Sequence, residues 1–283
     1  MGPAAFVEGV RGKALQCDGK SVYVVFGTGI VACYDLEGNR TWARLVERPS
    51  HGWGHSSSPV LVGDTLIVHV QKVWGLKASD GQTAWPADSA QAWGTPAGAR
   101  VGGTAVVITP AGDLIRADNG GKIASKLGGL TYASPLVHDG LVYFLQDKAC
   151  CVRLPEKAEP VAQLTAVWAN AGRQKRYYAS SVLHEGRLYM VNQAGDFNVL
   201  DAASGATLSG RKLDLGGTTY PSIALAGGHI FVSSDSGVTI VLTPGNDAPQ
   251  VARNTLEPFR STPVFEGARM YVRAMENLYC IGK

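Results

Sequence analysis

The stretch Ser57–Trp85, SSPVLVGDTLIVHVQKVWGLKASDGQTAW, reads as one complete module of a β-sheet. The apolar run Ser58–Val62 and the β-branched run Thr65–Val70 flank a Gly-Asp turn and predict two antiparallel strands. Val73–Ala78 predicts a third strand, and an Asp-Gly turn leads into a fourth that ends at Trp85. Four short strands in about 30 residues cannot bury both faces alone, so the module needs neighbours of the same kind.

Copies of this module recur through the whole chain. The glycine that closes the first strand returns at spacings of 44, 39, 38, 46, 41 and 40 residues. These spacings are typical of a four-stranded propeller blade. The sequence therefore predicts an all-β fold, a seven-bladed β-propeller of four-stranded antiparallel blades that forms a single domain over residues 1–283. The glycines of the seven copies are Gly19, Gly63, Gly102, Gly140, Gly186, Gly227 and Gly267.

Composition narrows the class of protein further. The chain has 45% hydrophobic residues and 35 glycines, which favours short strands around a sizeable core over long helices. The 26 basic residues nearly balance the 23 acidic ones, so we expect no nucleic-acid partner. The sequence has no apolar run long enough to span a membrane, and its first residues do not resemble a signal peptide. It could be a fragment of a longer chain.

The two ends of the chain suggest how the ring closes. The last copy stops after its third strand, at Ile281-Gly282-Lys283. We expect Ala5–Glu8 to supply the missing outer strand, because a closed ring leaves no open sheet edge. The alternative is a frayed tail, since Gly2-Pro3 and Gly9 weaken any strand there.

Two copies carry a tryptophan four residues after a turn glycine, Gly38 with Trp42 and Gly81 with Trp85. Together with the strand-plus-Asp element Cys33-Tyr34-Asp35, this pattern resembles the docking motif of quinoprotein-type (PQQ-like) β-propeller repeats. WD40 repeats fit less well, because the sequence has no Trp-Asp dipeptide. The tryptophan ring is expected to pack between adjacent blades, with an acceptor for its N–H group.

The resemblance implies a choice between two functions. Some members are dehydrogenases that hold pyrroloquinoline quinone (PQQ) and Ca²⁺, while others, like the outer-membrane β-barrel assembly lipoproteins, are periplasmic scaffolds without a cofactor. Fold alone does not decide between them. The chain is closer to the scaffolds, and we expect no cofactor and a protein or peptide partner, with a small ligand as the alternative.

Cys150-Cys151 raises the question of a redox site, because quinoprotein alcohol dehydrogenases carry a disulfide between adjacent cysteines. Here the pair falls inside a predicted strand, where adjacent side chains point to opposite faces and oppose such a bond. We interpret both as reduced structural cysteines. Cys17, Cys33 and Cys280 also replace apolar strand residues, and an odd total of five fits no disulfide framework.

No metal or nucleophile motif is present. The histidines are scattered, and only His51 and His55 share a loop, which could face the channel mouth or be solvated. The carboxylates of Asp35, Asp118 and Asp201 follow strands where a turn favours an Asp side chain, so we interpret them as structural. The six histidines are His51, His55, His69, His138, His184 and His229.

The most promising surface is formed by the residue that leads into the innermost strand of each blade, which we call the lead-in position. Four of these seven residues are aromatic and two are arginines, although aromatic residues make up 8% of the chain. A concave opening with aromatic walls and a few polar groups is the usual place for a ligand. The two arginines would be neighbours in a closed ring and would suit a carboxylate or phosphate. The lead-in residues are Arg11, Ser56, Trp93, Tyr132, Tyr178, Tyr220 and Arg260.

Two interpretations follow for these residues. The first is a non-catalytic scaffold that binds a protein or small ligand at the channel mouth. The second is a quinone-dependent oxidoreductase or another enzyme that uses the same mouth. The sequence offers no complete catalytic constellation, which favours the first. Simple packing of loops around a water-filled channel is the structural alternative to both.

Overall fold

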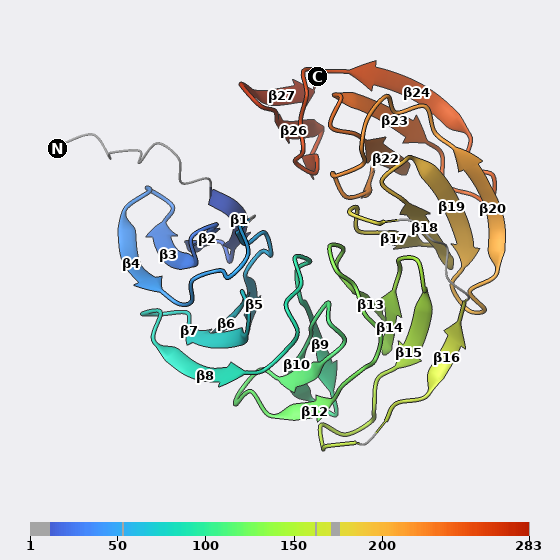
Figure 1. Ribbon diagram of the computed structural model, residues 1–283. Coiled ribbons are helices and arrows are strands. Elements are labelled where there is room, and N and C mark those ends of the chain that lie inside the picture. The colour runs from blue at the N-terminus through green and yellow to red at the C-terminus, as the bar shows by residue number, and fades with distance from the viewer. Residues whose placement is uncertain (1–11, 53, 162, 171–175, 283) are drawn as a thin grey trace. The chain divides into compact units, whose positions relative to one another are not determined.

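The computed structural model describes residues 12–52, 54–161, 163–170 and 176–282. These residues form seven antiparallel sheets, in which consecutive strands of the chain pair as neighbours (Figure 1). Six sheets have four strands and the last has three. The predicted fold class, an all-β seven-bladed β-propeller, is therefore confirmed. We number the sheets blade 1 to blade 7 in chain order.

The chain separates into two compact units, and the first comprises Met1–Thr131 with Leu154–Leu164. It holds blades 1 to 3. Blade 1 contains β1 (Gly12–Cys17), β2 (Ser21–Phe26), β3 (Ile30–Asp35) and β4 (Arg40–Leu45). Blade 2 contains β5 (Val60–Val62), β6 (Thr65–His69), β7 (Val73–Lys77) and β8 (Thr83–Ala87). Blade 3 contains β9 (Ala97–Val101), β10 (Thr104–Ile108), β11 (Leu114–Arg116) and β12 (Lys122–Ala124).

The second unit comprises Tyr132–Arg153 with Thr165–Lys283 and holds blades 4 to 7. Blade 4 contains β13 (Leu136–His138), β14 (Leu141–Phe144), β15 (Cys150–Arg153) and β16 (Ala166–Ala169). Blade 5 contains β17 (Val182–His184), β18 (Arg187–Val191), β19 (Asp196–Asp201) and β20 (Thr207–Lys212). Blade 6 contains β21 (Ala224–Ala226), β22 (His229–Ser233), β23 (Val238–Leu242) and β24 (Gln250–Thr255). Blade 7 contains β25 (Val264–Glu266), β26 (Arg269–Arg273) and β27 (Leu278–Gly282).

The core lies between the faces of adjacent blades. Blades 1 and 2 enclose Val25, Val31 and Leu66, which are fully buried, while blades 5 and 6 enclose Val199 and Ile230 in the same way. Each blade is therefore a thin sheet whose two central strands are apolar on both faces. This is why the strand pattern reads as short continuous apolar runs, and why one blade cannot fold without its neighbour.

Tryptophans join three pairs of blades by the same geometry. Trp42 Nε1 donates to the Ala78 carbonyl at 3.0 Å, Trp85 Nε1 to Ala117 at 3.0 Å and Trp168 Nε1 to Ala202 at 2.9 Å. Each ring lies against a glycine of the next blade, and a Cβ on that glycine would meet the ring at 2.5–2.6 Å. The glycines are Gly81, Gly120 and Gly205.

This geometry extends the prediction made from sequence. The expected packing of Trp42 and Trp85 between blades, with an acceptor for each N–H group, is confirmed. Each ring contacts a turn glycine of the following blade, so the turn glycine that receives Trp85 is Gly120 and not Gly81, although the ring also lies over Gly75 of its own blade. Blade 4 has no glycine four residues before its tryptophan, and Trp168 nevertheless docks on the next blade in the same way.

Blade 7 differs from the others at its outer edge. Within the described residues β27 has no strand on its far side, and Leu278 there is 72% exposed. The expected clasp strand, Ala5–Glu8, lies outside the described residues, so closure by the N-terminus stays a prediction. No helix in the described part of the chain is long and apolar enough to cross a membrane.

Candidate binding surface

A row of hydroxyl groups fixes the start of each innermost strand to the next blade. In blades 2 to 7 the residue two places after the lead-in position is Ser or Thr. In four cases its hydroxyl accepts the backbone N–H group of the equivalent residue in the preceding blade. These bonds are Ser58 N to Thr95 Oγ1 at 3.0 Å, Ser134 N to Ser180 Oγ at 3.0 Å, Ser180 N to Ser222 Oγ at 3.1 Å and Ser222 N to Thr262 Oγ1 at 3.0 Å. Because these bonds fix the backbone, they set the spacing of the lead-in side chains.

In the second unit four lead-in residues form one continuous row, which we call the tyrosine ladder: Tyr132, Tyr178, Tyr220 and Arg260. The Tyr132 and Tyr178 rings meet edge to face, with centroids 4.8 Å apart. Tyr178 and Tyr220 are stacked, with centroids 4.7 Å apart and planes 17° from parallel. The Arg260 guanidinium then lies 4.4 Å from the centroid of the Tyr220 ring. Both ring contacts and the cation–π contact are individually favourable.

Charged groups lie at both ends of the stacked pair. Arg260 Nη2 is 3.5 Å from Asp235 Oδ2, and its side chain is 63% exposed. Arg176, which is exposed, forms a hydrogen bond with the Tyr178 side chain, and this bond raises the pKa of Arg176 above its ordinary value. Asp235 is held in place, because its Oδ1 accepts the Thr218 N–H at 2.8 Å. Arg176 and Asp235 lie outside the lead-in positions, so the repeat pattern does not single them out.

In the first unit two lead-in residues form a separate pair. Ser56 Oγ donates to the Trp93 carbonyl at 3.0 Å, and Trp93 Nε1 donates to the Gly54 carbonyl at 3.3 Å. The ring of His51 meets Trp93 edge to face at 5.4 Å. His55 is buried, with Nε2 2.9 Å from the Ser57 carbonyl, so the expectation of a solvated loop is wrong for this histidine.

The structure therefore does not place all seven lead-in residues relative to one another. Arg11 lies outside the described residues, and the other six are divided between the two units. That all seven surround a single channel mouth stays a prediction.

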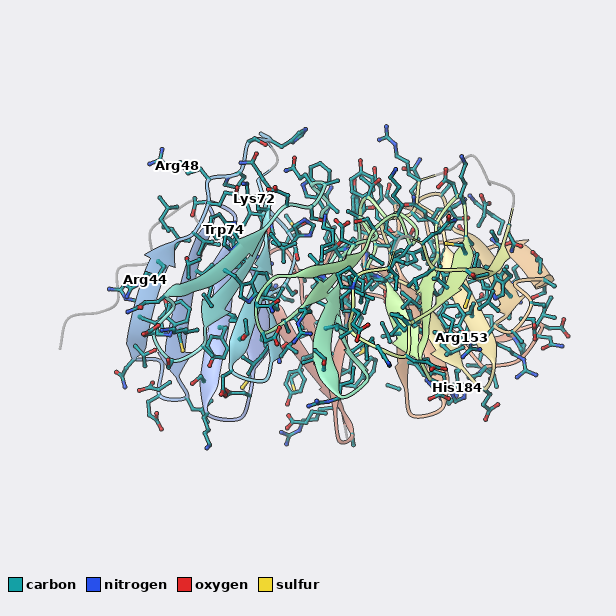
Figure 2. All side chains as sticks on the ribbon, turned by 90° about the horizontal axis from the view of Figure 1, so that it is seen from below. Arg44, Arg48, Lys72, Trp74, Arg153 and His184 are labelled. Atoms are coloured by element: carbon teal, nitrogen blue, oxygen red, sulfur yellow. The ribbon has the colours of Figure 1, made fainter. Side chains whose placement is uncertain are left out.

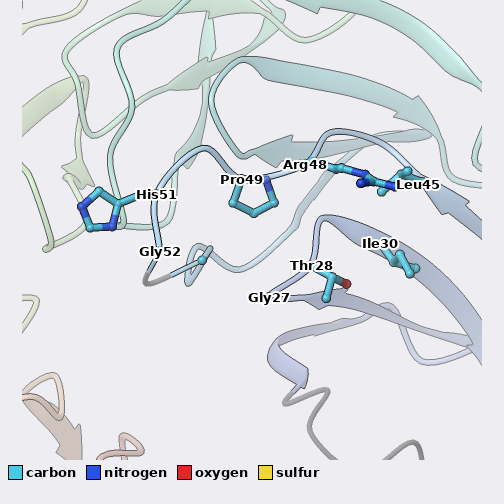
Figure 3. Close-up of a pocket in the computed structure, with 9 residues that line it drawn as sticks. Gly27, Thr28, Ile30, Leu45, Arg48, Pro49, His51 and Gly52 are labelled. Carbon is cyan, nitrogen blue, oxygen red and sulfur yellow. The ribbon is translucent and has the colours of Figure 1, made fainter.

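An open hollow of about 530 Å³ lies in blade 1, beside the loop that links it to blade 2 (Figure 3). Glycine backbone and six side chains line it, namely those of Thr28, Ile30, Leu45, Arg48, Pro49 and His51. The loop is anchored elsewhere by Glu47, whose Oε2 accepts the backbone N–H groups of residues 71 and 72 and the Trp74 Nε1–H. In Figure 2 Arg48, Lys72 and Trp74 lie toward this end of the first unit. The polar side chains of the hollow are those of Thr28, Arg48 and His51.

The cysteines do not form a redox centre among the described residues. Cys150 pairs with Phe144 and Cys151 with Tyr143 across β14 and β15, and all five cysteines carry free thiols. Cys151 is fully buried, and burial raises the pKa of its thiol to about 11, which opposes thiolate formation. The interpretation of Cys151 as structural agrees with this environment, whereas Cys17 and Cys280 are exposed.

The three candidate carboxylates stabilise turns and strands. Asp35 Oδ1 accepts the Asn39 N–H at 2.7 Å, and Asp201 Oδ1 accepts the Ser204 N–H at 2.8 Å. Asp118 instead pairs with the Arg116 guanidinium at 2.6 Å, which lowers the pKa of its carboxyl. All three therefore have structural partners, as predicted, although Asp118 differs in the kind of partner.

One buried histidine has an incomplete set of hydrogen bonds. His69 is fully buried between blades 2 and 3, its Nε2 lies 3.2 Å from the Ala90 carbonyl, and its Nδ1 has no hydrogen-bond partner in the described structure. Burial lowers the pKa of His69 to about 4. The nearby Asp113 carboxylate accepts Ser89 Oγ–H at 2.7 Å and pairs with Lys122 at 3.2 Å. His69 is therefore neutral at physiological pH.

Repeated four-stranded blades joined by tryptophans that dock on the next blade define a β-propeller of the quinoprotein-like class. More specifically, the chain belongs to the family described as outer membrane protein assembly factor BamB, whose model matches residues 4–101 and 193–281. A comparison with curated proteins found no match.

Two solved structures show the same fold. BamB from Moraxella catarrhalis is 14% identical, with a TM-score of 0.72 over 95% of this chain and 83% of that chain. The computationally designed Ika8 protein is 11% identical, with a TM-score of 0.74 over 96% of this chain and 84% of that chain. At these identities the likeness concerns the fold.

The residues do not fit a quinone site with Ca²⁺. In the described portion of the chain no three His, Cys, Asp or Glu side chains are grouped so that they could hold a metal ion. Ca²⁺ requires six to eight oxygen ligands.

Proposed function

We propose that this protein is a non-catalytic scaffold that binds a protein partner at the tyrosine ladder. The observation that carries the proposal is the ladder itself: three tyrosines and an arginine stack at equivalent positions of four blades. Tyrosine and arginine are enriched at the energetic centres of protein interfaces, because each combines a large contact area with a polar end. The ladder side chains are partly or fully exposed, so a partner can reach them.

Family membership supports this proposal. The description of the family names the assembly of outer membrane proteins, which is work done on protein partners. By the same likeness we propose that the protein acts in the periplasm. The role of a quinone oxidoreductase has no observation in its favour.

The test is capture of partners from an envelope extract by the immobilised protein. A double variant, Tyr132→Ala with Arg260→Ala, should fold normally and lose the captured protein, because both side chains lie outside the apolar strands. The matched control is Tyr34→Ala with Arg153→Ala, which removes a half-buried tyrosine and an exposed arginine that do not belong to the ladder. Arg153 lies at the other end of its blade, near His184 in Figure 2. Retention of the partner by the first variant would place the binding surface elsewhere.

A further inference from the structure

We propose that the partner segment bound at the tyrosine ladder is acidic, and that Arg260 and Arg176 hold its carboxylates. This inference rests on the proposed function and adds the chemistry of the partner. The ladder contains two sets of groups. Some already contact one another, and the others are available to a partner.

The rings of Tyr178 and Tyr220 each have two neighbours within the ladder. Tyr178 contacts Tyr132 and Tyr220, and Tyr220 contacts Tyr178 and the Arg260 guanidinium. A partner that inserted an aromatic or proline ring would have to separate these contacts. Stacking by the partner is therefore disfavoured, and the ladder presents mainly hydroxyl and guanidinium groups.

These polar groups are predominantly donors. A guanidinium has five N–H donors and no acceptor, and a phenol O–H also donates readily to a carboxylate. Arg260 is 63% exposed, and Arg176 is fully on the surface. A carboxylate, which only accepts, complements this set, and the planar guanidinium can bind it with two parallel hydrogen bonds.

Asp235 marks the position of one carboxylate. Its Oδ2 contacts Arg260 through a single N–O distance of 3.5 Å, which is longer than a good charge-assisted hydrogen bond. Since Asp235 Oδ1 is held by the Thr218 N–H, its carboxylate cannot swing into a two-point contact with Arg260 without losing that bond. An incoming carboxylate can form a two-point contact with the Arg260 guanidinium. Replacing Asp235 by the partner's carboxylate at Arg260 is therefore favourable.

A protein segment fits better than a nucleic acid. The ladder offers two guanidinium groups with an acidic side chain beside one of them, whereas a nucleic-acid site needs a continuous basic track along the phosphate backbone. The small net charge of the chain, +3, agrees with this conclusion. Separate carboxylates on an extended segment suit two separate guanidinium groups.

The test uses fluorescence anisotropy of a labelled peptide of alternating Glu and Ser, measured against the full chain. The same peptide with Gln in place of every Glu serves as the neutral probe. We expect the Glu peptide to bind at least about tenfold more tightly than the Gln peptide at low salt, and to weaken as salt is added. Equal binding of the two peptides, or tighter binding of a single-stranded oligonucleotide than of the Glu peptide, would overturn the proposal.

Three substitutions locate the site. Arg260→Gln should weaken binding of the Glu peptide by about tenfold, and Asp235→Asn should strengthen it by about threefold because it releases Arg260 while keeping an acceptor for Thr218 N–H. Arg153→Gln is the matched control and should change nothing. Melting curves check that each variant is folded, and unchanged binding in both Arg260→Gln and Asp235→Asn contradicts the assignment.

The two proposals fail in different ways. If the double ladder variant loses a captured partner but the Glu peptide does not bind the parent protein, the acidic segment is wrong and the scaffold function stands. If the partner is retained by the double variant, the ladder is not the binding surface and both proposals fall.

Discussion

The joints between blades are made in two chemically different ways. At the joints that follow blades 1, 2 and 4, a tryptophan ring fills the space beside a glycine and donates one hydrogen bond to a main-chain carbonyl. At the joint between blades 5 and 6 there is no tryptophan. There, polar side chains of blade 5 reach over to the turn Pro244-Gly245-Asn246-Asp247 of blade 6.

The polar joint is made of several hydrogen bonds. Arg187 Nε donates to Asn246 Oδ1 at 2.6 Å, and the Tyr189 hydroxyl accepts the Gly245 N–H at 2.9 Å. Ser209 donates to the Asn246 carbonyl, and Arg211 donates to the carbonyls of Asp247 and Ala248. The tyrosines that correspond to Tyr189, Tyr23 in blade 1 and Tyr143 in blade 4, instead lie against tryptophans.

The two kinds of joint lie at equivalent places in the blades, but different chemical groups form them. Where tryptophan is present, the glycine turn leaves space for its ring, and at two of the three joints a tyrosine packs on it. Where tryptophan is absent, between blades 5 and 6, main-chain carbonyls of the turn accept hydrogen bonds from blade 5. Hydrogen bonds of tyrosine and arginine thus replace the buried ring. The stabilising contribution should therefore be larger at the tryptophan joints, because a buried ring removes more apolar area from water.

The largest effect is expected from removing a docking tryptophan. Trp42, Trp85 and Trp168 are 7%, 6% and 8% exposed. Replacing any of them by Ala should lower the free energy of unfolding by about 3–5 kcal/mol, because it leaves a cavity between blades. Denaturant unfolding measures the loss.

A substitution on the receiving side sharpens this prediction. Gly120→Ala places a Cβ about where the Trp85 ring lies, 2.6 Å from Cε3, at a positive φ of 74°. It should therefore also be destabilising, whereas Gly140→Ala, at a similar φ of 70° but in open space, isolates the cost of the backbone alone. A neutral Trp168→Ala would show that blade 4 does not use the tryptophan joint.

A smaller, pH-dependent effect is expected at the joint between blades 2 and 3, which contains His69. Burial holds the pKa of His69 at about 4 in the folded state, below its ordinary value of 6.5. The unfolded chain therefore binds a proton first as the pH falls, and the folded state loses stability from about pH 6.5 down to pH 4. We expect a loss of about 2 kcal/mol between pH 7.5 and pH 5.

The His69→Leu variant provides the control for this effect. It should lack the pH dependence in that window, as followed by denaturant unfolding at several pH values. The lowered pKa values of Asp35, Asp118, Asp201 and Glu257 act below this window, because those carboxylates lose stabilising charge only as the pH falls through their own folded pKa values. An unchanged slope in His69→Leu would assign the pH dependence to other groups.

The smallest effect is expected at the polar joint. Tyr189→Phe removes the acceptor of the Gly245 N–H but keeps the buried ring, so it should cost about 1 kcal/mol. Tyr23→Phe in blade 1 is the matched control, because the Tyr23 hydroxyl bonds to residues of its own blade, among them Asp18 at 3.4 Å, and not to the turn of the next blade. A cost at Tyr189 as large as at the tryptophans would mean that the polar joint is the stronger one.

The candidate surface could be predicted only in part. The lead-in positions were visible in the sequence, because each precedes the recurring Ser-Pro-like start of an innermost strand. Their stacking was not visible, since ring orientation depends on the hydroxyl bonds that link Ser134, Ser180, Ser222 and Thr262. Arg176 and Asp235 were missed for the same reason: they come from other loops, and the sequence pattern does not describe how loops meet.

The sequence alone determined the number of blades, their strand order and the class of fold. These properties depend on local patterns, namely short continuous apolar runs and turn glycines at regular spacing, which act within a few residues. The tertiary structure decided which glycine receives which tryptophan, because Trp85 and Gly120 belong to different blades. It also decided that Trp168 docks although its own blade lacks the turn glycine, since the Ala-x-x-Gly turn it needs lies in the next blade, at Ala202 and Gly205. The tryptophan hydrogen bonds between blades join residues 32 to 36 positions apart, and only the folded chain brings such residues together.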